Sequence, residues 1–414
     1  MTPRAVALAL ATLALFQGTA MAQVPATAPS APVGQWLAVN PVGVSLDPAN
    51  PHDNYGINTV VLDPQASGTL YLGTNYQGIY KSTKGGASWA KIDTGAGSSL
   101  VDQGRVWALA LDPFNHTTLY AVSGYGAGGP LKSTDGGVSW THTLPSTSPT
   151  AQQLGTNDIY NVAVDPYTPN HLLASFHYYW YGNQDSGVIE STDGGASWSF
   201  HTPPAGAGWG AGNSVWFLDT SHTWLLGSQN AGLWRTTNAG QSWTQVSSTS
   251  IAHGGIKALY RNPRTGLLVI ATWNGVLRST DDGQSWQDFA SGLPYAAYET
   301  VVSDGLHLYT APSFPESNNA QANGPWYTVA EGGSGWTAYN SQTPCANGVC
   351  NGPVDAAFDP VSSTIYTANW DAGAWMLATG VPSAAPPAGA APASDAPVPG
   401  SPSDDAATDS ATGP

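Results

Sequence analysis

Short apolar runs that end in tight turns recur along most of this chain. Five of them finish with Asp-Pro or Asn-Pro, at residues 60–64, 109–113, 162–166, 259–263 and 356–360. A second apolar run follows each turn, as at 69–73, and a third follows after a further turn, as at 78–82. Runs of four to eight residues bounded by Gly, Pro, Asn and Asp are typical of β-strands. The pattern therefore predicts an all-β chain.

A second repeat, Ser/Thr-x-Asp-x-Gly-x-x-Trp, lies between the third strand of each unit and a fourth strand that the Trp opens. Its copies span residues 82–89, 133–140, 191–198, 236–243 and 279–286, and a worn copy spans 329–336. The copies are 43 to 58 residues apart, a period in the range of one four-stranded propeller blade. Each unit is thus expected to be a blade of four antiparallel strands.

The number of innermost strands sets the size of the predicted ring. They begin near residues 59, 108, 160, 214, 257, 300 and 354, which predicts seven blades; six or eight are the alternatives. The last unit has no fourth strand after it, but residues 35–39 can supply one from the N-terminus. We therefore expect a single seven-bladed β-propeller closed by an N-terminal strand, since closure removes open sheet edges.

The Asp residues of the repeat invite a catalytic interpretation, but a structural role is the better prediction. An Asp side chain accepts backbone N–H bonds within a tight turn, and Gly tolerates the positive φ that such turns need. Lys84 and Asn238 replace the Asp in two copies, which a structural turn can tolerate. Asp135, Asp193 and Asp281 are accordingly expected to hold turns.

The two ends of the chain differ from its body. Arg4, an apolar run over 5–16 and Ala20-Met21-Ala22 match a signal peptide over 1–22, which predicts secretion to the extracellular space or periplasm; an uncleaved membrane anchor is the alternative. Residues 23–33 form a predicted disordered linker and 34–378 the propeller. Residues 379–414, rich in Pro, Ala and Asp, are predicted to be a disordered tail.

Composition narrows the partners and cofactors. Only 9% of residues are charged and the formal net charge is −16, which argues against nucleic acid and membrane insertion. We expect no cofactor, a monomer, and an extracellular polysaccharide or glycan as the partner. In an oxidising compartment the two cysteines, Cys345 and Cys350, are expected to form a local disulfide; a redox pair is the alternative, and a metal site would need further ligands.

The repeat with its periodic Trp resembles the Asp-box, or bacterial neuraminidase, repeat of sialidases, xyloglucan hydrolases, sortilin-type receptors and a photosystem assembly factor. The resemblance covers about residues 34 to 378 and implies a propeller, but it does not fix the chemistry. Sialidases carry three substrate-clamping arginines, and only Arg105 is well placed here. Xyloglucan hydrolases have a cleft between two propellers, whereas this chain has one.

Unusual polar and aromatic residues gather in the loops that enter the innermost strands and in those that join second to third strands. Both loop sets lie on one face of a propeller, so we expect a carbohydrate site there. The candidate catalytic residues are Asp53, Asp102, Asp158 and Glu299. The candidate substrate-binding residues are Tyr55, Arg105, Trp107, Tyr160, His177, Trp180, His253, Lys257, Trp273, Trp370 and Asp371.

Three hypotheses remain open from the sequence: a carbohydrate-active enzyme, which is a hydrolase or a lyase, a non-catalytic binding propeller, and other chemistry. A glycoside hydrolase needs two carboxylates that flank the bond, whereas a polysaccharide lyase needs a Tyr or His base with Arg105 to neutralise a uronate carboxylate. A non-catalytic propeller that binds a glycan or protein, as a lectin or scaffold, is the alternative. Metal-assisted chemistry with His177 and His253 is a further possibility.

Overall fold

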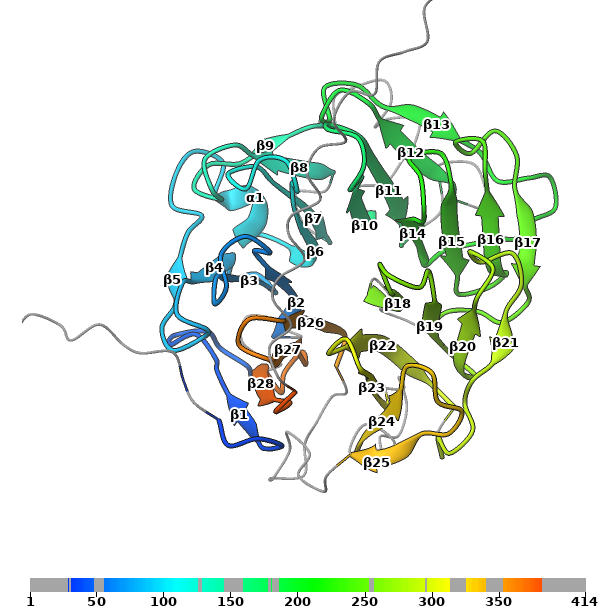
Figure 1. The fold of residues 1–414 in the computed structure, drawn as a ribbon. Coiled ribbons are helices and arrows are strands. Elements are labelled where there is room, and N and C mark those ends of the chain that lie inside the picture. Colours follow the sequence, from blue (N-terminus) through cyan, green and yellow to red (C-terminus); the bar gives the residue numbers. More distant parts are fainter. Residues whose placement is uncertain are drawn as a thin grey trace, which may run out of the picture.

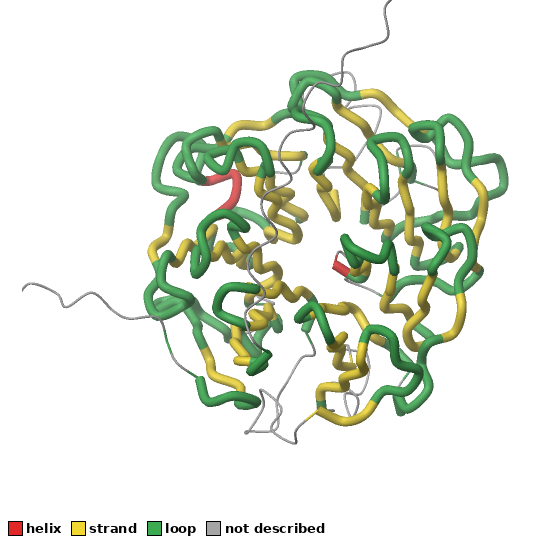
Figure 2. The backbone as a smooth tube through the Cα atoms, viewed as in Figure 1, coloured by secondary structure: helices red, strands yellow, loops and turns green. Residues whose placement is uncertain are grey.

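The computed structural model describes residues 29, 31–47, 56–125, 129–144, 159–177, 180, 186–252, 257–294, 296–312, 325–339 and 353–381. These residues form seven four-stranded antiparallel sheets, arranged as blades around a central axis (Figure 1). Strands and loops make up nearly all of the described chain (Figure 2), and α1 (Ser99–Asp102) is a single short helical turn. The prediction of an all-β, seven-bladed propeller is confirmed.

In blades 1 to 6 the strands run outward from the axis in chain order. Blade 1 contains β2 (Ile57–Leu62), β3 (Leu70–Thr74), β4 (Ile79–Ser82) and β5 (Ala90–Lys91). Blade 2 contains β6 (Arg105–Leu111), β7 (Leu119–Gly124), β8 (Pro130–Ser133) and β9 (Thr141–His142). Blade 3 contains β10 (Ile159–Val164), β11 (Leu172–Phe176), β12 (Val188–Ser191) and β13 (Ser199–His201).

The next three blades repeat this order. Blade 4 contains β14 (Asn213–Phe217), β15 (Trp224–Ser228), β16 (Gly232–Thr236) and β17 (Thr244–Ser247). Blade 5 contains β18 (Leu259–Arg261), β19 (Leu268–Thr272), β20 (Gly275–Ser279) and β21 (Gln287–Asp288). Blade 6 contains β22 (Tyr298–Ser303), β23 (His307–Pro312), β24 (Trp326–Ala330) and β25 (Thr337–Tyr339).

Blade 7 closes the ring with strands from both ends of the described chain. It contains β26 (Asp355–Asp359), β27 (Thr364–Ala368), β28 (Ala374–Ala378) and, outermost, β1 (Trp36–Ala38). β1 pairs antiparallel with β28, with Trp36 opposite Leu377, and the Trp36 ring lies 4.8 Å from that of Trp326 in blade 6. The N-terminal segment therefore pairs with the blade that would otherwise lack a fourth strand, as predicted.

The turns between third and fourth strands share one hydrogen-bond pattern. In blade 3, Ser191 Oγ accepts from Gly195 N at 2.8 Å, and Asp193 Oδ1 accepts from Ser197 N at 2.9 Å. The same two contacts occur with Asp135 in blade 2, Asn238 in blade 4 and Asp281 in blade 5. These side chains hold the turns, because their oxygens accept the amides that the turn leaves unpaired.

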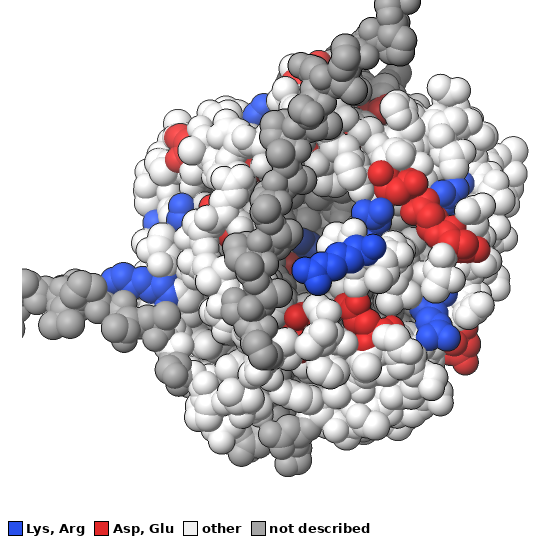
Figure 3. All heavy atoms as spheres, viewed as in Figure 1, with Lys and Arg blue, Asp and Glu red and all other residues white. Residues whose placement is uncertain are grey.

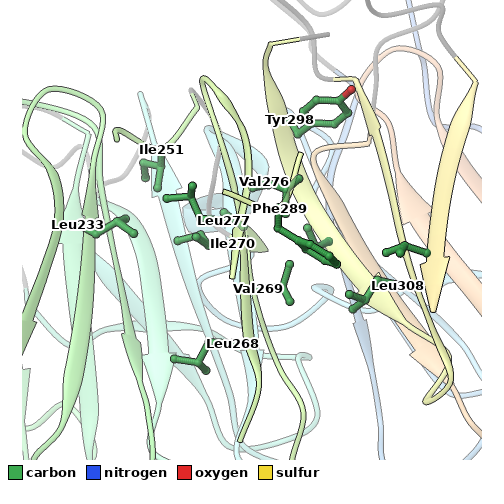
Figure 4. Packing of buried hydrophobic residues seen from close by; sticks show 14 of the residues in the cluster. Leu233, Ile251, Leu268, Val269, Ile270, Val276, Leu277, Phe289, Tyr298 and Leu308 are labelled. Atoms are coloured by element: carbon green, nitrogen blue, oxygen red, sulfur yellow. The ribbon is translucent and has the colours of Figure 1, made fainter. Parts of the chain in front are cut away.

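The core lies between blades, where apolar side chains of neighbouring sheets interdigitate. One cluster joins blades 4, 5 and 6 through Leu233, Ile270, Phe289 and Leu308, which are nearly or fully buried (Figure 4). The Trp of the repeat adds to this packing where it is buried: Trp336 is 3% exposed, and its Nε1 donates to Phe289 O at 2.6 Å. Packing between blades therefore fixes the ring as one unit.

Two faces of the ring are distinguished below. The turn face carries the turns after the innermost strands, marked by Pro64, Pro113 and Pro166, together with the Ser/Thr-x-Asp turns. The loop face carries the loops that enter the innermost strands and those that join second to third strands. On the turn face, acidic and basic side chains gather over blades 4 to 6 (Figure 3), where Arg235 pairs with Asp282 at 2.6 Å.

Candidate functional site

A hydroxyl and an imidazole meet on the loop face between blades 2 and 3. Tyr125 follows β7, and His177 follows β11, so the two side chains come from loops that join second to third strands in neighbouring blades. Tyr125 Oη lies 3.3 Å from His177 Nδ1, and Tyr125 is 56% exposed. The pair can thus reach solvent and exchange a proton within one hydrogen bond.

A cation and two further aromatic rings support this pair. The Arg105 guanidinium lies 4.6 Å from the centre of the Tyr125 ring, and the Tyr160 ring lies 5.0 Å from the His177 imidazole. Trp107 contacts Tyr160 edge-on at 5.9 Å. Arg105, Trp107 and Tyr160 are nearly buried, whereas Tyr125 and His177 are not. The site is therefore an exposed Tyr–His pair that packs against a buried arginine and two buried aromatic rings.

The backbone at Tyr125 is left-handed, with φ of 56°, as it is at Tyr76 in blade 1 and Trp370 in blade 7. Side chains other than Gly and Asn rarely adopt this conformation. The amides of Tyr76 and Trp370 donate to the next blade, to Gly104 O and Ile57 O respectively, each at 2.9 Å. Those bonds between blades offset the local strain at these two turns.

Beside this site, two carboxylates and a lysine meet between blades 1 and 2. Lys91 Nζ lies 2.5 Å from Asp102 Oδ1 and 3.5 Å from Asp93 Oδ2. A Cβ added at Gly78 would clash with both carboxylates, so they lie side by side beneath that turn. Burial raises the pKa of Asp93 to about 7, aided by the charge of Asp102.

The predicted catalytic acids do not form one described group. Asp102 is partly exposed and paired with Lys91, while Glu299, in blade 6, is fully buried. Asp53 and Asp158 lie outside the described residues, as do Tyr55 and His253 and the predicted disulfide residues Cys345 and Cys350. Among the described residues, no cluster of three or more His, Cys, Asp or Glu could hold a metal ion.

The other predicted binding residues are dispersed. Trp180 is 6% exposed and packs edge-on against Phe176 at 5.6 Å, which makes it part of the core of blade 3. Trp370 is buried, and Trp273 and Asp371 are half-buried in the corresponding turns of blades 5 and 7. Lys257 lines the cavity described below.

Tyr125 was placed on the loop face by the sequence but was not among the predicted site residues, and Asp93 had no predicted role. Tyr125 could have been found from its place directly after the second strand of blade 2, in a loop on the same face as His177. Asp93 follows a two-residue strand and stands in no repeat, and its proximity to Asp102 arises only when the turn at Gly78 folds over both.

A cavity of about 400 Å³ lies around the axis, apart from the Tyr–His pair. It is bounded by the ends of innermost strands and by Pro64, Pro113 and Pro166, which places it toward the turn face. Lys257 and Asn161 line it as well. The described cavity and the Tyr125–His177 pair therefore belong to different faces of the ring.

No protein-family model matches the sequence, and no curated protein matches it. The fold is similar to those of a GH74 enzyme of Niastella koreensis, with TM-score 0.59 and 20% identity over 78% of this chain and 52% of that one, and the GH74 xyloglucanase of Xanthomonas campestris, with 0.57, 18%, 83% and 53%. YCF48 bound to D1 peptide is also similar, with 0.57, 13%, 85% and 99%.

This chain spans about half the length of the two GH74 enzymes and nearly all of YCF48. At these identities the similarity shows a shared propeller fold. Within the described part of the chain, no helix is both long enough and apolar enough to cross a membrane.

Proposed function

We propose that this chain is a secreted carbohydrate-active propeller of the Asp-box type that binds an extracellular polysaccharide on its loop face. The observation that carries the proposal is the exposed Tyr125–His177 pair, 3.3 Å apart, above Arg105. An exposed aromatic ring can stack on the C–H face of a sugar, and nearby polar groups can bond its hydroxyls. The GH74 relatives, one of which is a xyloglucanase, agree with a glycan ligand.

Of the two reaction classes, the described residues favour elimination by a lyase over hydrolysis. In an elimination on a uronate, a base removes the proton α to the carboxylate and the bond to the leaving sugar oxygen breaks, leaving an unsaturated uronate. Tyr125 and His177 are within proton-transfer distance of each other. Arg105, behind the Tyr125 ring, supplies positive charge that attracts a uronate and stabilises negative charge on the hydroxyl. A hydrolase would instead need two accessible carboxylates, and Asp93 is buried.

The test is incubation with polygalacturonate, alginate and neutral xyloglucan, followed by ultraviolet absorbance of unsaturated uronates and by assay of reducing ends. We expect new absorbance with a uronate polymer. Tyr125→Phe and His177→Ala are expected to lower the rate by roughly 10² to 10⁴, the usual contribution of a general acid or base. Tyr167→Phe is the matched control, because Tyr167 is an exposed tyrosine on the turn face.

A non-catalytic glycan-binding propeller is the second candidate, favoured by the burial of Arg105, which is 8% exposed. It predicts binding that Tyr125→Ala weakens, without new absorbance or reducing ends. Reducing ends that disappear in Asp102→Ala, without ultraviolet absorbance, would identify a hydrolase instead. If no polysaccharide binds and none is cleaved, the proposal of a carbohydrate ligand is wrong.

A further inference from the structure

The central cavity has the lining of a small-molecule site. Apart from Lys257 and Asn161, its described lining is apolar, and includes the aromatic residues Trp216 and Phe217 from blade 4. Its volume of about 400 Å³ falls in the range of small-ligand pockets, which are mostly apolar with a few placed polar groups. The lining comes from blades 1 to 4, and Lys257 reaches it from blade 5.

Lys257 is the only charged residue among the described lining residues. Its ammonium makes no hydrogen bond or ion pair with any residue that the structure describes; only its backbone oxygen accepts a bond, from Thr300 Oγ1 at 3.2 Å. An ammonium beside apolar walls is costly unless it is paired. The cavity therefore contains an ammonium group that has no hydrogen-bond or ion-pair partner among the described residues.

A second buried group lies within electrostatic reach of Lys257. Asp355, at the start of β26, is 2% exposed, and its Oδ2 accepts from Thr59 Oγ1 at 2.7 Å and from Val60 N at 3.0 Å. Its Oδ1 has no hydrogen-bond partner among the described residues. Burial raises the pKa of Asp355, while the charge of Lys257 lowers it. Asp355 Oδ2 thus joins blades 7 and 1, and the Lys257 ammonium makes no ion pair with this carboxylate.

We propose that the central cavity binds a small aromatic monocarboxylate from the turn face, with its carboxylate on Lys257 and its ring between Trp216, Phe217 and the prolines. The charge complementarity selects the anionic head, because Lys257 is the one charged residue of the described lining. The prolines and aromatic rings select an apolar body, since the contact area that they offer is mostly apolar. This site is separate from the Tyr125–His177 pair and does not depend on the proposed polysaccharide activity.

The probes are cinnamate, cinnamyl alcohol and acetate, with binding to the full chain measured by calorimetry and by tryptophan fluorescence. Cinnamate is expected to bind at least tenfold more tightly than the other two, because one lacks the charge and the other lacks the ring. These comparisons use the unaltered protein, so they decide the proposal even if a variant fails to fold.

Lys257→Met keeps the length of the side chain and removes its charge, and it is expected to weaken cinnamate binding at least about tenfold. Lys84→Met is the matched control, because Lys84 lies in the Ser/Thr-x-Asp turn of blade 1, away from the cavity lining. His177→Ala should leave cinnamate binding unchanged. Equal binding of cinnamate and the alcohol, equal binding of cinnamate and acetate, full binding by Lys257→Met, or no binding of cinnamate would each overturn the proposal.

Discussion

Carboxylates on the two faces of this propeller have opposite titration behaviour. On the turn face, Ser285 donates to Asp281 from its hydroxyl and its amide, and these bonds lower the pKa of Asp281 to about 2. On the loop face, burial beside Asp102 raises the pKa of Asp93 to about 7. An aspartate therefore holds a turn as a carboxylate with a lowered pKa on one face, and is a buried carboxyl group with a raised pKa on the other.

The difference follows from where the hydrogen-bond donors come from. In the repeated turns, every donor to the Asp lies within four residues along the chain, so each turn satisfies its own carboxylate. On the loop face, Asp93 and Asp102 come from either side of a connection between blades and meet beneath Gly78. Ile79 N and Lys91 offset part of their repulsion.

The largest expected effect concerns a buried charge network on the turn face of blade 3. His171 Nδ1 lies 2.6 Å from Asp165 Oδ2, and its Nε2 lies 2.8 Å from Glu190 Oε1. Hydrogen bonds to these carboxylates raise the pKa of His171 to about 9 despite its burial, and hydrogen bonds from His171 and His201 lower that of Glu190 to about 2. Removing His171 leaves two buried carboxylates without their shared cation.

His171→Ala is expected to lower the free energy of unfolding by about 3–5 kcal/mol near pH 6, the usual cost of breaking a buried ion pair. The His171 contribution is complete below pH 6.5 and is lost as the pH rises through 9, whereas that of Glu190 is complete above pH 4.5 and is lost toward pH 2. Urea unfolding from pH 2 to 10 measures both. His222→Ala is the control, because His222 is exposed. If the free energy of unfolding of His171→Ala fell with pH above 6.5 as steeply as that of the unaltered protein, the raised pKa of His171 would not be the cause.

A smaller effect of opposite sign is expected at Asp93. Because its folded-state pKa is raised from 3.8 to about 7, the folded protein loses stability as the pH rises from 3.8 through 7. Asp93→Asn keeps an acceptor for Ile79 N and carries no charge. It should therefore unfold with a free energy about 1–2 kcal/mol higher than the unaltered protein at pH 8, a gain limited by the loss of Lys91 as a partner.

The matched variant on the turn face is Asp193→Asn. Hydrogen bonds from Ser197 and Ser191 lower the pKa of Asp193, so its negative charge favours folding above pH 3.8 and that contribution is lost at lower pH. Asp193→Asn should be the less stable form at pH 8. If both variants were less stable than the unaltered protein at pH 8, the carboxylates of the two faces would not differ in their effect on stability.

The repeated elements were predictable because each carries its own signal. The strand ends at Pro64 and Pro113, the turns at Asp193 and Asp281, and the closing strand at Trp36 follow from local turn chemistry and from counting units. The loop face follows from propeller geometry, which placed Arg105, Trp107, Tyr160 and His177 on one face. Which of them touch could not be read from spacing, since contact depends on the positions of neighbouring blades.

Two features had no signal in the sequence. The cavity at the axis is lined by the ends of innermost strands and by three of their prolines, and Lys257 enters it from a blade whose inner strand, β18, has three residues. The left-handed backbone at Tyr125 was equally hidden, because an aromatic residue is an uncommon choice for positive φ.

That backbone gives the smallest expected effect and the most specific comparison of the two faces. Tyr125 is exposed and has φ of 56°, whereas Tyr167, exposed on the turn face, has no positive φ. At position 125, Gly should be more stable than Ala by about 1 kcal/mol, because Ala cannot adopt left-handed backbone without strain. At position 167 the order should reverse, since Gly there only adds freedom to the unfolded chain. Thermal unfolding of the four variants measures both differences.

Both replacements at 125 should abolish polysaccharide binding, so Tyr125→Gly would keep stability while losing function. The same order of Gly and Ala in stability at the two positions would show that the backbone at Tyr125 is not strained.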